Sequence, residues 1–278
     1  MEIQNPFKGL ICACGQDEDS VIVDDRRKVL VDDVRADELY GLAMKHYGNG
    51  LIQEALDSYE ECLKFNPDHV SALYNLGTIF LERNDGYSAK EHFQKVIDVQ
   101  PTHHLATYNL GFLHYERKEY AEAVHYFTLA SKLDAEDFDT WVNLGRAHRY
   151  MGHRKEAIKS ISRALELDPS SSLANFNLAN TFFHFRENEK AIESYKRTTE
   201  LDPDHADAFF NLAVVYQEER QFEEAIECYK EAAAIDPRLE DDVYDSLQNI
   251  EAGLHKQADI EEVKRPSIYF NSTKAPLK

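Results

Sequence analysis

The sequence predicts an all-α repeat protein, because one residue pattern returns every 34 residues along most of the chain. The pattern is clearest from Phe138 to Ser171, where Leu144 and Gly145 follow Trp141 at fixed spacing. The alanine at the middle of each repeat has no exception: Ala55, Ala89, Ala123, Ala157, Ala191 and Ala225. A proline closes each repeat except the third, which has Ala135: Pro67, Pro101, Pro169, Pro203 and Pro237.

Six such repeats fill residues 36–239, with the boundaries 36–69, 70–103, 104–137, 138–171, 172–205 and 206–239. The pattern resembles the tetratricopeptide repeat (TPR), a helix–turn–helix unit of the same period. The resemblance implies a right-handed superhelical solenoid, in which each repeat packs only on its neighbours and no single central core exists.

Within each repeat we expect a first helix over positions 2–14 and a second over positions 18–31. Positions 4, 7, 8 and 11 gather on one face of the first helix at about 100° per residue, and this face is apolar. The small residue at position 8 and the alanine at position 20 allow the paired helices to approach closely. The proline at position 32 cannot continue a helix and therefore separates the repeats.

Three segments flank the repeats. Residues 1–35 are predicted to be irregular, either as a simple lead-in or as a docking segment that uses the apolar runs 21–23 and 29–31. Residues 240–256 are predicted to form an amphipathic capping helix, because apolar residues recur there three or four positions apart. Residues 257–278 are predicted to be a basic flexible tail, in which Ser267 follows two basic residues and a proline and is a weak candidate for phosphorylation.

Charge and composition argue against several functions. The net charge of −20 disfavours binding to nucleic acid or to anionic lipid. There is no apolar run long enough for membrane insertion and no signal-peptide pattern, so we expect an intracellular, cytoplasmic protein. We find no phosphate loop, nucleophile motif or zinc-protease motif, so neither a cofactor nor an enzymatic activity is expected. Cys12 and Cys14 form a lone pair without further metal ligands, and Cys62 and Cys228 are expected to be structural thiols.

The face opposite the apolar stripe holds the first candidate binding residues. Position 6 is asparagine in five repeats: Asn75, Asn109, Asn143, Asn177 and Asn211. In the TPR family this face lines the inside of the superhelix, so the resemblance implies a ladder of amides along a peptide-binding groove. An amide both donates and accepts, and it can pair with an extended peptide backbone of any sequence. The alternative is that asparagine is an ordinary filler at this position.

The fourth repeat holds the sharper candidate site. It carries six Lys and Arg against four Asp and Glu, a net charge of +2, and is the one basic repeat. Arg146 and Arg149 lie three residues apart, Tyr150 follows, and Asn143 and the fifth repeat's Asn177 and Asn180 flank them. Two guanidinium groups beside amides suit a carboxylate, a phosphate or an acidic side chain. The alternative is that the arginines pair with nearby acids of the same chain.

Two further features bear on function. Chaperone-binding members of the family clamp a carboxylate with lysines at positions 2 and 5, and these positions hold no lysine here. His46, His114 and His148 fall on the buried face, where a core histidine paired with a neighbour is expected rather than a metal ligand.

We therefore predict a non-enzymatic adaptor or scaffold that binds an extended or helical segment of a partner protein within a multiprotein complex. The segment is expected to be acidic near the fourth repeat. Two alternatives remain open: a structural subunit held by its convex face and tails, and a recognition module that acts with a separate transferase.

Overall fold

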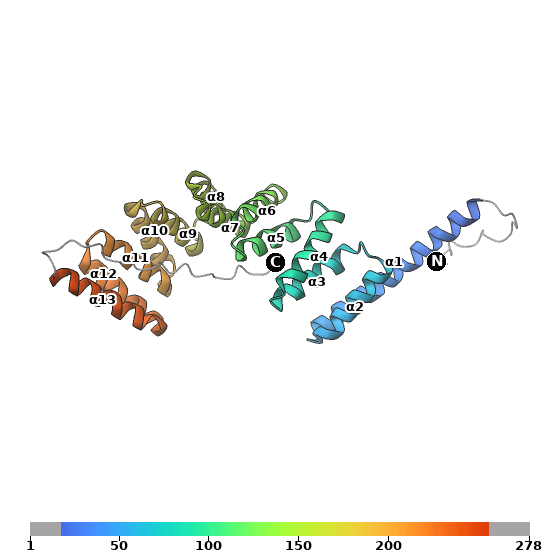
Figure 1. Cartoon of the computed structure of the whole chain (residues 1–278), viewed down its shortest axis with the longest axis horizontal. Helices are drawn as coiled ribbons and strands as arrows, with labels where there is room; N and C mark the ends of the chain where they lie inside the picture. The colour runs from blue at the N-terminus through green and yellow to red at the C-terminus, as the bar shows by residue number, and fades with distance from the viewer. Residues whose placement is uncertain (1–17, 256–278) are drawn as a thin grey trace, which may run out of the picture. The chain divides into compact units, whose positions relative to one another are not determined.

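The computed structural model describes the backbone of residues 18–255 and the side chains of residues 31–251. The described backbone is helical and contains no strand, which confirms the all-α prediction (Figure 1). The chain divides into two compact units, residues 1–99 and residues 100–278. The predicted basic tail, Ser267, Cys12 and Cys14 lie outside the described residues.

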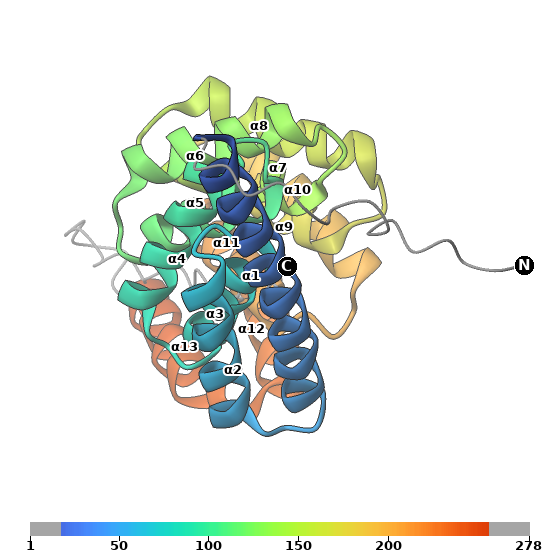
Figure 2. The same ribbon diagram turned by 90° about the vertical axis from the view of Figure 1, so that its right-hand side faces the viewer.

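The amino-terminal unit contains two helix pairs. They are α1 (Glu18–Gly48) with α2 (Ile52–Phe65), and α3 (Val70–Glu82) with α4 (Gly86–Val99). Helix α1 lies beside α2 in both views (Figures 1 and 2). Residues 18–35 were expected to be irregular, and the structure instead places them in α1. The physical reason is that no glycine or proline lies between residues 16 and 40, so nothing interrupts a helix that the first repeat already nucleates.

The carboxy-terminal unit continues with four more pairs. They are α5 (His104–Glu116) with α6 (Tyr120–Leu133), α7 (Phe138–Tyr150) with α8 (Arg154–Leu167), α9 (Ser172–His184) with α10 (Asn188–Leu201), and α11 (Ala206–Glu218) with α12 (Phe222–Ile235). The short 3-10 helix η1 (Pro237–Leu239) then leads into α13 (Glu240–His255). Val243 and Ile250 of α13 are buried in one cluster with Tyr229 of α12, so α13 covers the apolar end of the last pair.

The helix starts keep the sequence period. The first helices of five repeats begin at residues 70, 104, 138, 172 and 206, each 34 residues after the last. They occupy positions 1–13 and the second helices positions 17–30, one residue earlier than predicted.

The close approach of the paired helices is visible at positions 8 and 20. The position-20 alanine is fully buried in all six repeats. A methyl group added to Gly77, at position 8, would lie 2.7 Å from the Phe93 ring of the paired helix. Both positions therefore have no room for a larger side chain.

The first helices also share a capping arrangement that the sequence reading missed. His69, His103 and His205 precede α3, α5 and α11, and each ring Nδ1 accepts the backbone N–H three residues later at 3.1–3.3 Å. Ser171 caps α9 in the same way with its hydroxyl at 3.1 Å. A neutral imidazole therefore takes the role that Ser or Asp usually has at a helix N-terminus.

A pair of glycine substitutions in the amino-terminal unit tests the packing. Gly77→Ala should lower the free energy of unfolding by about 1–2 kcal/mol, because the overpacking cost exceeds the gain in helix propensity. Gly41→Ala in α1 is the matched control: nothing lies within 4 Å of the added methyl group, so stability should rise by up to about 1 kcal/mol. Urea unfolding followed by circular dichroism measures both, and equal effects of the two substitutions would contradict the packing constraint.

The histidine caps predict a loss of stability in mild acid. A protonated ring cannot accept the N–H, and burial lowers the pKa of His103 and His205 in the folded chain. The unfolded chain then binds the proton more tightly, so stability is full above about pH 6.5 and falls as the pH drops below it. The double variant His103→Ser, His205→Ser keeps caps that do not titrate. Between pH 7 and pH 5 the free energy of unfolding of this variant should fall less than that of the parent, by up to about 1 kcal/mol per cap. Denaturant unfolding at the two pH values measures this, and the same pH dependence in both proteins would contradict the role of the caps.

Candidate functional site

The predicted binding residues lie in both units. Asn75 is on α3 of the amino-terminal unit, where its Nδ2 donates to the Tyr59 hydroxyl at 2.9 Å. It lines a pocket of about 100 Å³ together with Met44, Tyr47, Tyr59, Thr78 and Ile79. The other predicted residues lie in the carboxy-terminal unit.

In the carboxy-terminal unit the first helices lie next to one another, since α7 packs against both α5 and α9. Asn143 on α7 joins them through its amide. Its Nδ2 donates to the Tyr108 hydroxyl of α5 at 2.9 Å, and its Oδ1 accepts from Arg146 Nη1 at 3.0 Å. The asparagine at position 6 thus fixes the tyrosine of the preceding repeat and the arginine one turn later.

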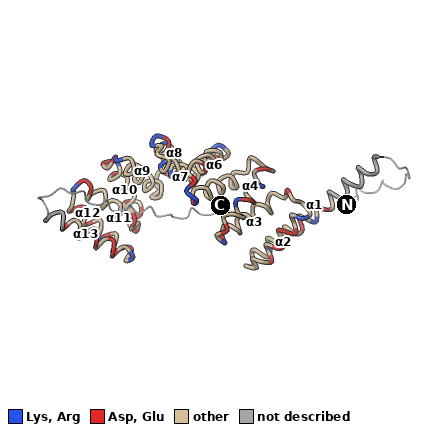
Figure 3. The backbone as a smooth tube through the Cα atoms, viewed as in Figure 1, with Lys and Arg blue, Asp and Glu red and all other residues tan. Residues whose placement is uncertain are grey.

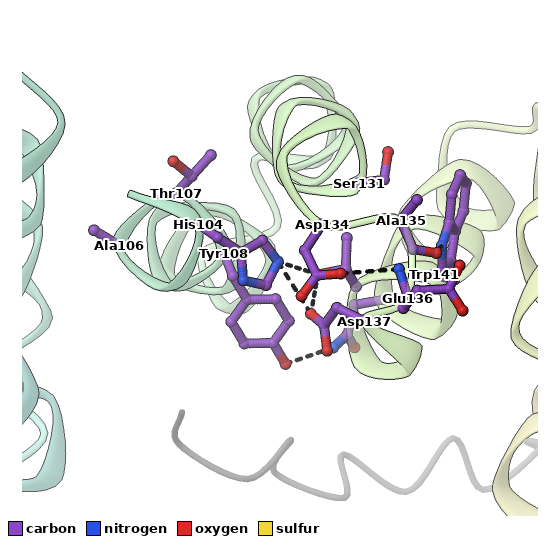
Figure 4. A network of polar contacts seen from close by, with 12 residues as sticks. His104, Ala106, Thr107, Tyr108, Ser131, Asp134, Ala135, Glu136, Asp137 and Trp141 are labelled. Carbon is purple, nitrogen blue, oxygen red and sulfur yellow. Dashed lines mark hydrogen bonds and ion pairs between the residues drawn. The ribbon is translucent and has the colours of Figure 1, made fainter. Parts of the chain in front are cut away.

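The start of α7 is fixed by a second set of polar contacts on the same two helices (Figure 4). His104 Nε2 of α5 lies 3.3 Å from Asp137 Oδ2, and the Thr140 hydroxyl also donates to that carboxylate. The Trp141 indole N–H donates to the Ala135 carbonyl at 2.9 Å. These contacts hold α7 in register with α5 and so determine where Asn143 and Arg146 lie.

Arg146 and Tyr150 form an aromatic cluster with α5 and α6. The Arg146 guanidinium lies 4.8 Å from the centre of the Tyr115 ring. The Tyr150 ring stacks on Tyr120 at 4.7 Å between centroids and meets Tyr115 edge-on at 5.9 Å. Burial raises the pKa of Tyr115 to about 12 despite the nearby Arg146, so its hydroxyl is neutral at physiological pH. The cluster therefore holds Arg146 in place without neutralising its charge.

The remaining amides form a second cluster. The Tyr195 hydroxyl of α10 donates to Asn180 Oδ1, and Asn211 Nδ2 of α11 approaches the same oxygen at 3.3 Å. Asn177 Nδ2 donates to the Leu173 carbonyl one turn earlier at 2.8 Å. Asn109 is buried as well, and neither of its amide atoms has a hydrogen-bond partner among the described residues.

These contacts correct one premise of the amide-ladder hypothesis. Asn109, Asn143, Asn177, Asn180 and Asn211 were expected to line an accessible groove, but all five are at most 5% exposed. Four of them are engaged by the fold itself, through tyrosines, an arginine, a backbone carbonyl and each other. Sequence spacing placed them on one face, but it could not show that neighbouring aromatic rings cover that face. Their contact with a partner stays a prediction.

Arg149 is corrected in the same sense. It was expected beside Arg146 on an accessible face, yet its side chain is only 2% exposed and lies 4.9 Å from the Tyr150 ring centre. Burial, followed by the neighbouring Arg146, lowers the pKa of its guanidinium, which stays charged at neutral pH. Burial lowers the pKa of His184 on α9, and the positive charge of Arg149 lowers it further. The two arginines therefore differ: Arg149 supplies positive potential from within, and Arg146 is the more exposed of the two.

Arg146 is half-buried and has no ion pair with a described acidic residue, and it contacts Asn143 and Tyr115. Basic residues gather around α7 and α8, whereas acidic ones predominate on α2, α12 and α13 (Figure 3). The part of the chain around α7 and α8 is thus locally basic in an acidic chain.

The described residues hold neither a membrane span nor a metal site. Between residues 18 and 255 no helix combines the length and apolar character that a bilayer span requires. The same part of the chain contains no group of three or more His, Cys, Asp or Glu side chains placed to hold a metal ion. His114, expected to be a paired core histidine, lies 2.6 Å from Glu119 Oε2. The intracellular location stays a prediction.

Comparison with protein families assigns the repeats. Tetratricopeptide repeat models match residues 40–86, 87–137 and 70–103. A model of the TPR domain of cytochrome c-type biogenesis protein H matches residues 129–241. The chain is a tetratricopeptide repeat protein. TPR proteins mediate protein–protein interactions, and they are generally interaction modules rather than enzymes.

Solved TPR structures share this fold. PilW, a type IV pilus biogenesis factor, is 21% identical with a TM-score of 0.64, over 78% of this chain and 98% of its own. PilF of Pseudomonas aeruginosa is 20% identical with a TM-score of 0.61, over the same shares of the two chains. YrrB, described as a TPR protein with an unusual peptide-binding site, is 24% identical with a TM-score of 0.54, over 64% and 92%. No curated protein sequence matches the chain.

The burial of Arg149 predicts how it responds to substitution. Arg149→Glu places a carboxylate in a buried site and should lower the free energy of unfolding by more than about 3 kcal/mol. Arg149→Met, of similar length and apolar, should be close to neutral. Arg146→Glu, at a half-buried position, should cost less than about 1 kcal/mol. Denaturant unfolding of the three variants gives the order, and equal losses for Arg146→Glu and Arg149→Glu would contradict the difference in burial.

Proposed function

We propose that this TPR protein is a non-enzymatic adaptor that holds a segment of a partner protein on the first-helix face of its carboxy-terminal unit. In this proposal Arg146 receives an acidic group of the segment. The observation that carries it is the state of Arg146: a half-buried guanidinium, oriented by Asn143 and Tyr115, without an ion pair to a described residue. A charge-assisted hydrogen bond to such a group contributes about 1.5–3 kcal/mol.

The neighbouring surface supports an extended segment with apolar side chains beside its acid. Three half-buried apolar residues lie at positions 2 and 9 of their repeats: Leu105 and Phe112 on α5 and Leu173 on α9. At about 100° per residue these two positions fall on the same face of a first helix as Arg146. Apolar residues on both sides of one cation suit a segment in which a single acid is flanked by hydrophobic residues. The peptide-binding site described for YrrB supports use of the same kind of fold for this purpose.

The buried amides have a different role in this proposal than in the sequence-based hypothesis. Asn143 positions Arg146, Asn180 and Asn211 join α9, α10 and α11, and Asn177 bonds to a carbonyl within α9. Tyr150 supports the guanidinium through Tyr115. They act on the partner through Arg146 and the shape of the face rather than through a ladder of backbone contacts.

A peptide-display selection against the full chain tests the proposal. Selected peptides should be enriched in Asp or Glu beside apolar residues, and Arg146→Glu should weaken their binding by about tenfold or more. Lys159→Glu, an identical charge change at an exposed position of α8, is the matched control and should bind as the parent does. Circular dichroism checks that both variants fold. Selection of peptides without Asp or Glu, or equal binding of the selected peptides to both variants, would contradict the proposal.

A further inference from the structure

The sulfur of Met44 on α1 meets two polar hydrogen-bond donors of the amino-terminal unit. The Tyr59 hydroxyl of α2 donates to Met44 Sδ at 3.0 Å, and Asn75 Nδ2 of α3 donates to the same sulfur at 3.2 Å. Asn75 Nδ2 also donates to the Tyr59 hydroxyl at 2.9 Å, and the Tyr40 hydroxyl lies farther from it, at 3.4 Å. Burial raises the pKa of Tyr59 to about 12, so its hydroxyl keeps the proton that it donates. Two strong donors thus share an acceptor that is weak, because a thioether sulfur accepts poorly.

The fifth repeat has the same arrangement with an oxygen in place of the sulfur. Each of the three residues has an equivalent four repeats later, at the same position of its repeat: Asn180 for Met44, Tyr195 for Tyr59 and Asn211 for Asn75. There Asn180 Oδ1 accepts from the Tyr195 hydroxyl and lies 3.3 Å from Asn211 Nδ2. The geometry of the repeat therefore directs both donors to a point where an oxygen atom can receive them.

Met44 is also accessible to a small oxidant. It is 44% exposed, and it lines the pocket of about 100 Å³ described above, which has room for one more oxygen atom. The sulfur, the Tyr59 hydroxyl oxygen and Asn75 Nδ2 form a nearly equilateral triangle with sides of 3.0, 3.2 and 2.9 Å. Both donors therefore approach the sulfur from one side, and they leave its other lone pair open.

We propose that Met44 is a site of reversible oxidation by hydroperoxides, and that Tyr59 and Asn75 receive the sulfoxide oxygen. The outer oxygen of the peroxide adds to the open lone pair of the sulfur as the O–O bond breaks. The sulfur is oxidised, the peroxide is reduced to an alcohol or to water, and the proton of the transferred oxygen moves to the departing one. Rotation about the flexible side-chain bonds of Met44 then turns the new oxygen toward the two donors. A methionine sulfoxide reductase reverses the oxidation.

Oxidation at this site differs from ordinary damage to a methionine. A sulfoxide commonly disrupts packing because it brings a polar oxygen into an apolar site. At Met44 the oxygen instead meets two donors and reproduces the contacts of Asn180. Oxidation also makes one wall of the pocket polar, so the surface of the amino-terminal unit becomes responsive to oxidants.

Thermal unfolding of the full chain before and after hydrogen peroxide tests the proposal. A Met151→Leu background leaves Met44 as the one methionine among the described residues. Oxidation should raise the midpoint by about 2–4 °C, as expected for one improved hydrogen bond. Tyr59→Phe keeps the ring and removes one donor, so oxidation of that variant should lower the midpoint. Met44→Leu is the matched control and should not respond to peroxide. The same shift on oxidation with and without the Tyr59 hydroxyl would overturn the proposal.

The stereochemistry of the sulfoxide gives a second test. Met151 is the comparison within the same chain, because it is 38% exposed and no described residue donates a hydrogen bond to its sulfur. The two sulfoxide epimers are reduced by different enzymes. After peroxide treatment, peptide mass spectrometry should show that one reductase alone restores Met44, whereas each restores only about half of Met151. Failure of Met44 to oxidise when Met151 does, or equal repair of Met44 by both enzymes, would contradict the one-sided arrangement of the donors.

Discussion

The close approach of the two helices in each repeat is the constraint on which the rest of the structure depends. It requires a fully buried alanine at position 20 of the second helix and a glycine or alanine at position 8 of the first. Because the backbones nearly touch there, the side chain at position 24 must lie across the small residue. Its identity follows the residue at position 8: repeats with glycine carry Phe93, Phe127 or Ile161, whereas Ala43, Ala179 and Ala213 accompany Tyr59, Tyr195 and Tyr229. Each of the three tyrosine hydroxyls bonds with an amide on a first helix. The bond holds the ring in a position that leaves room for the alanine methyl group.

This link between packing and polar contacts explains why Asn143 and Asn180 are buried. A tyrosine at position 5 or 24 brings a hydroxyl into the apolar interior, where an unpaired hydroxyl is costly. Asparagine at position 6, or at position 9 in the fifth repeat, supplies the partner. Asn143 and Asn180 are thus a consequence of how the repeats stack. Asn143, which bonds to Tyr108, also orients Arg146. The position of this guanidinium therefore depends on contacts that stabilise the fold.

The period, the helix pairs and the alanine packing could be predicted from the sequence, because each is a local pattern repeated in register. Burial of Asn143 and Arg149 could not, since it depends on aromatic rings supplied by the neighbouring repeats. The extension of α1 was missed because short apolar runs of three residues among charges resemble a loop until the absence of glycine and proline is considered. The histidine caps were missed for another reason. Histidine is seldom a helix cap, although His69, His103 and His205 recur at the period and precede helix starts.

The net charge of −20 shapes what an accessible Arg146 can select. At physiological salt the field of each charge extends only about 8 Å, so a ligand far from α7 meets mostly acidic surface and one beside α7 meets Arg146, with the buried charge of Arg149 behind it. A strongly acidic segment would be repelled before it reached Arg146, and the gain from one contact would not offset that repulsion along its length. A segment with a single acid among apolar or basic residues avoids the penalty and keeps the contact. In the proposed function the surrounding acids therefore sharpen selection by rejecting segments that carry more negative charge than Arg146 can receive.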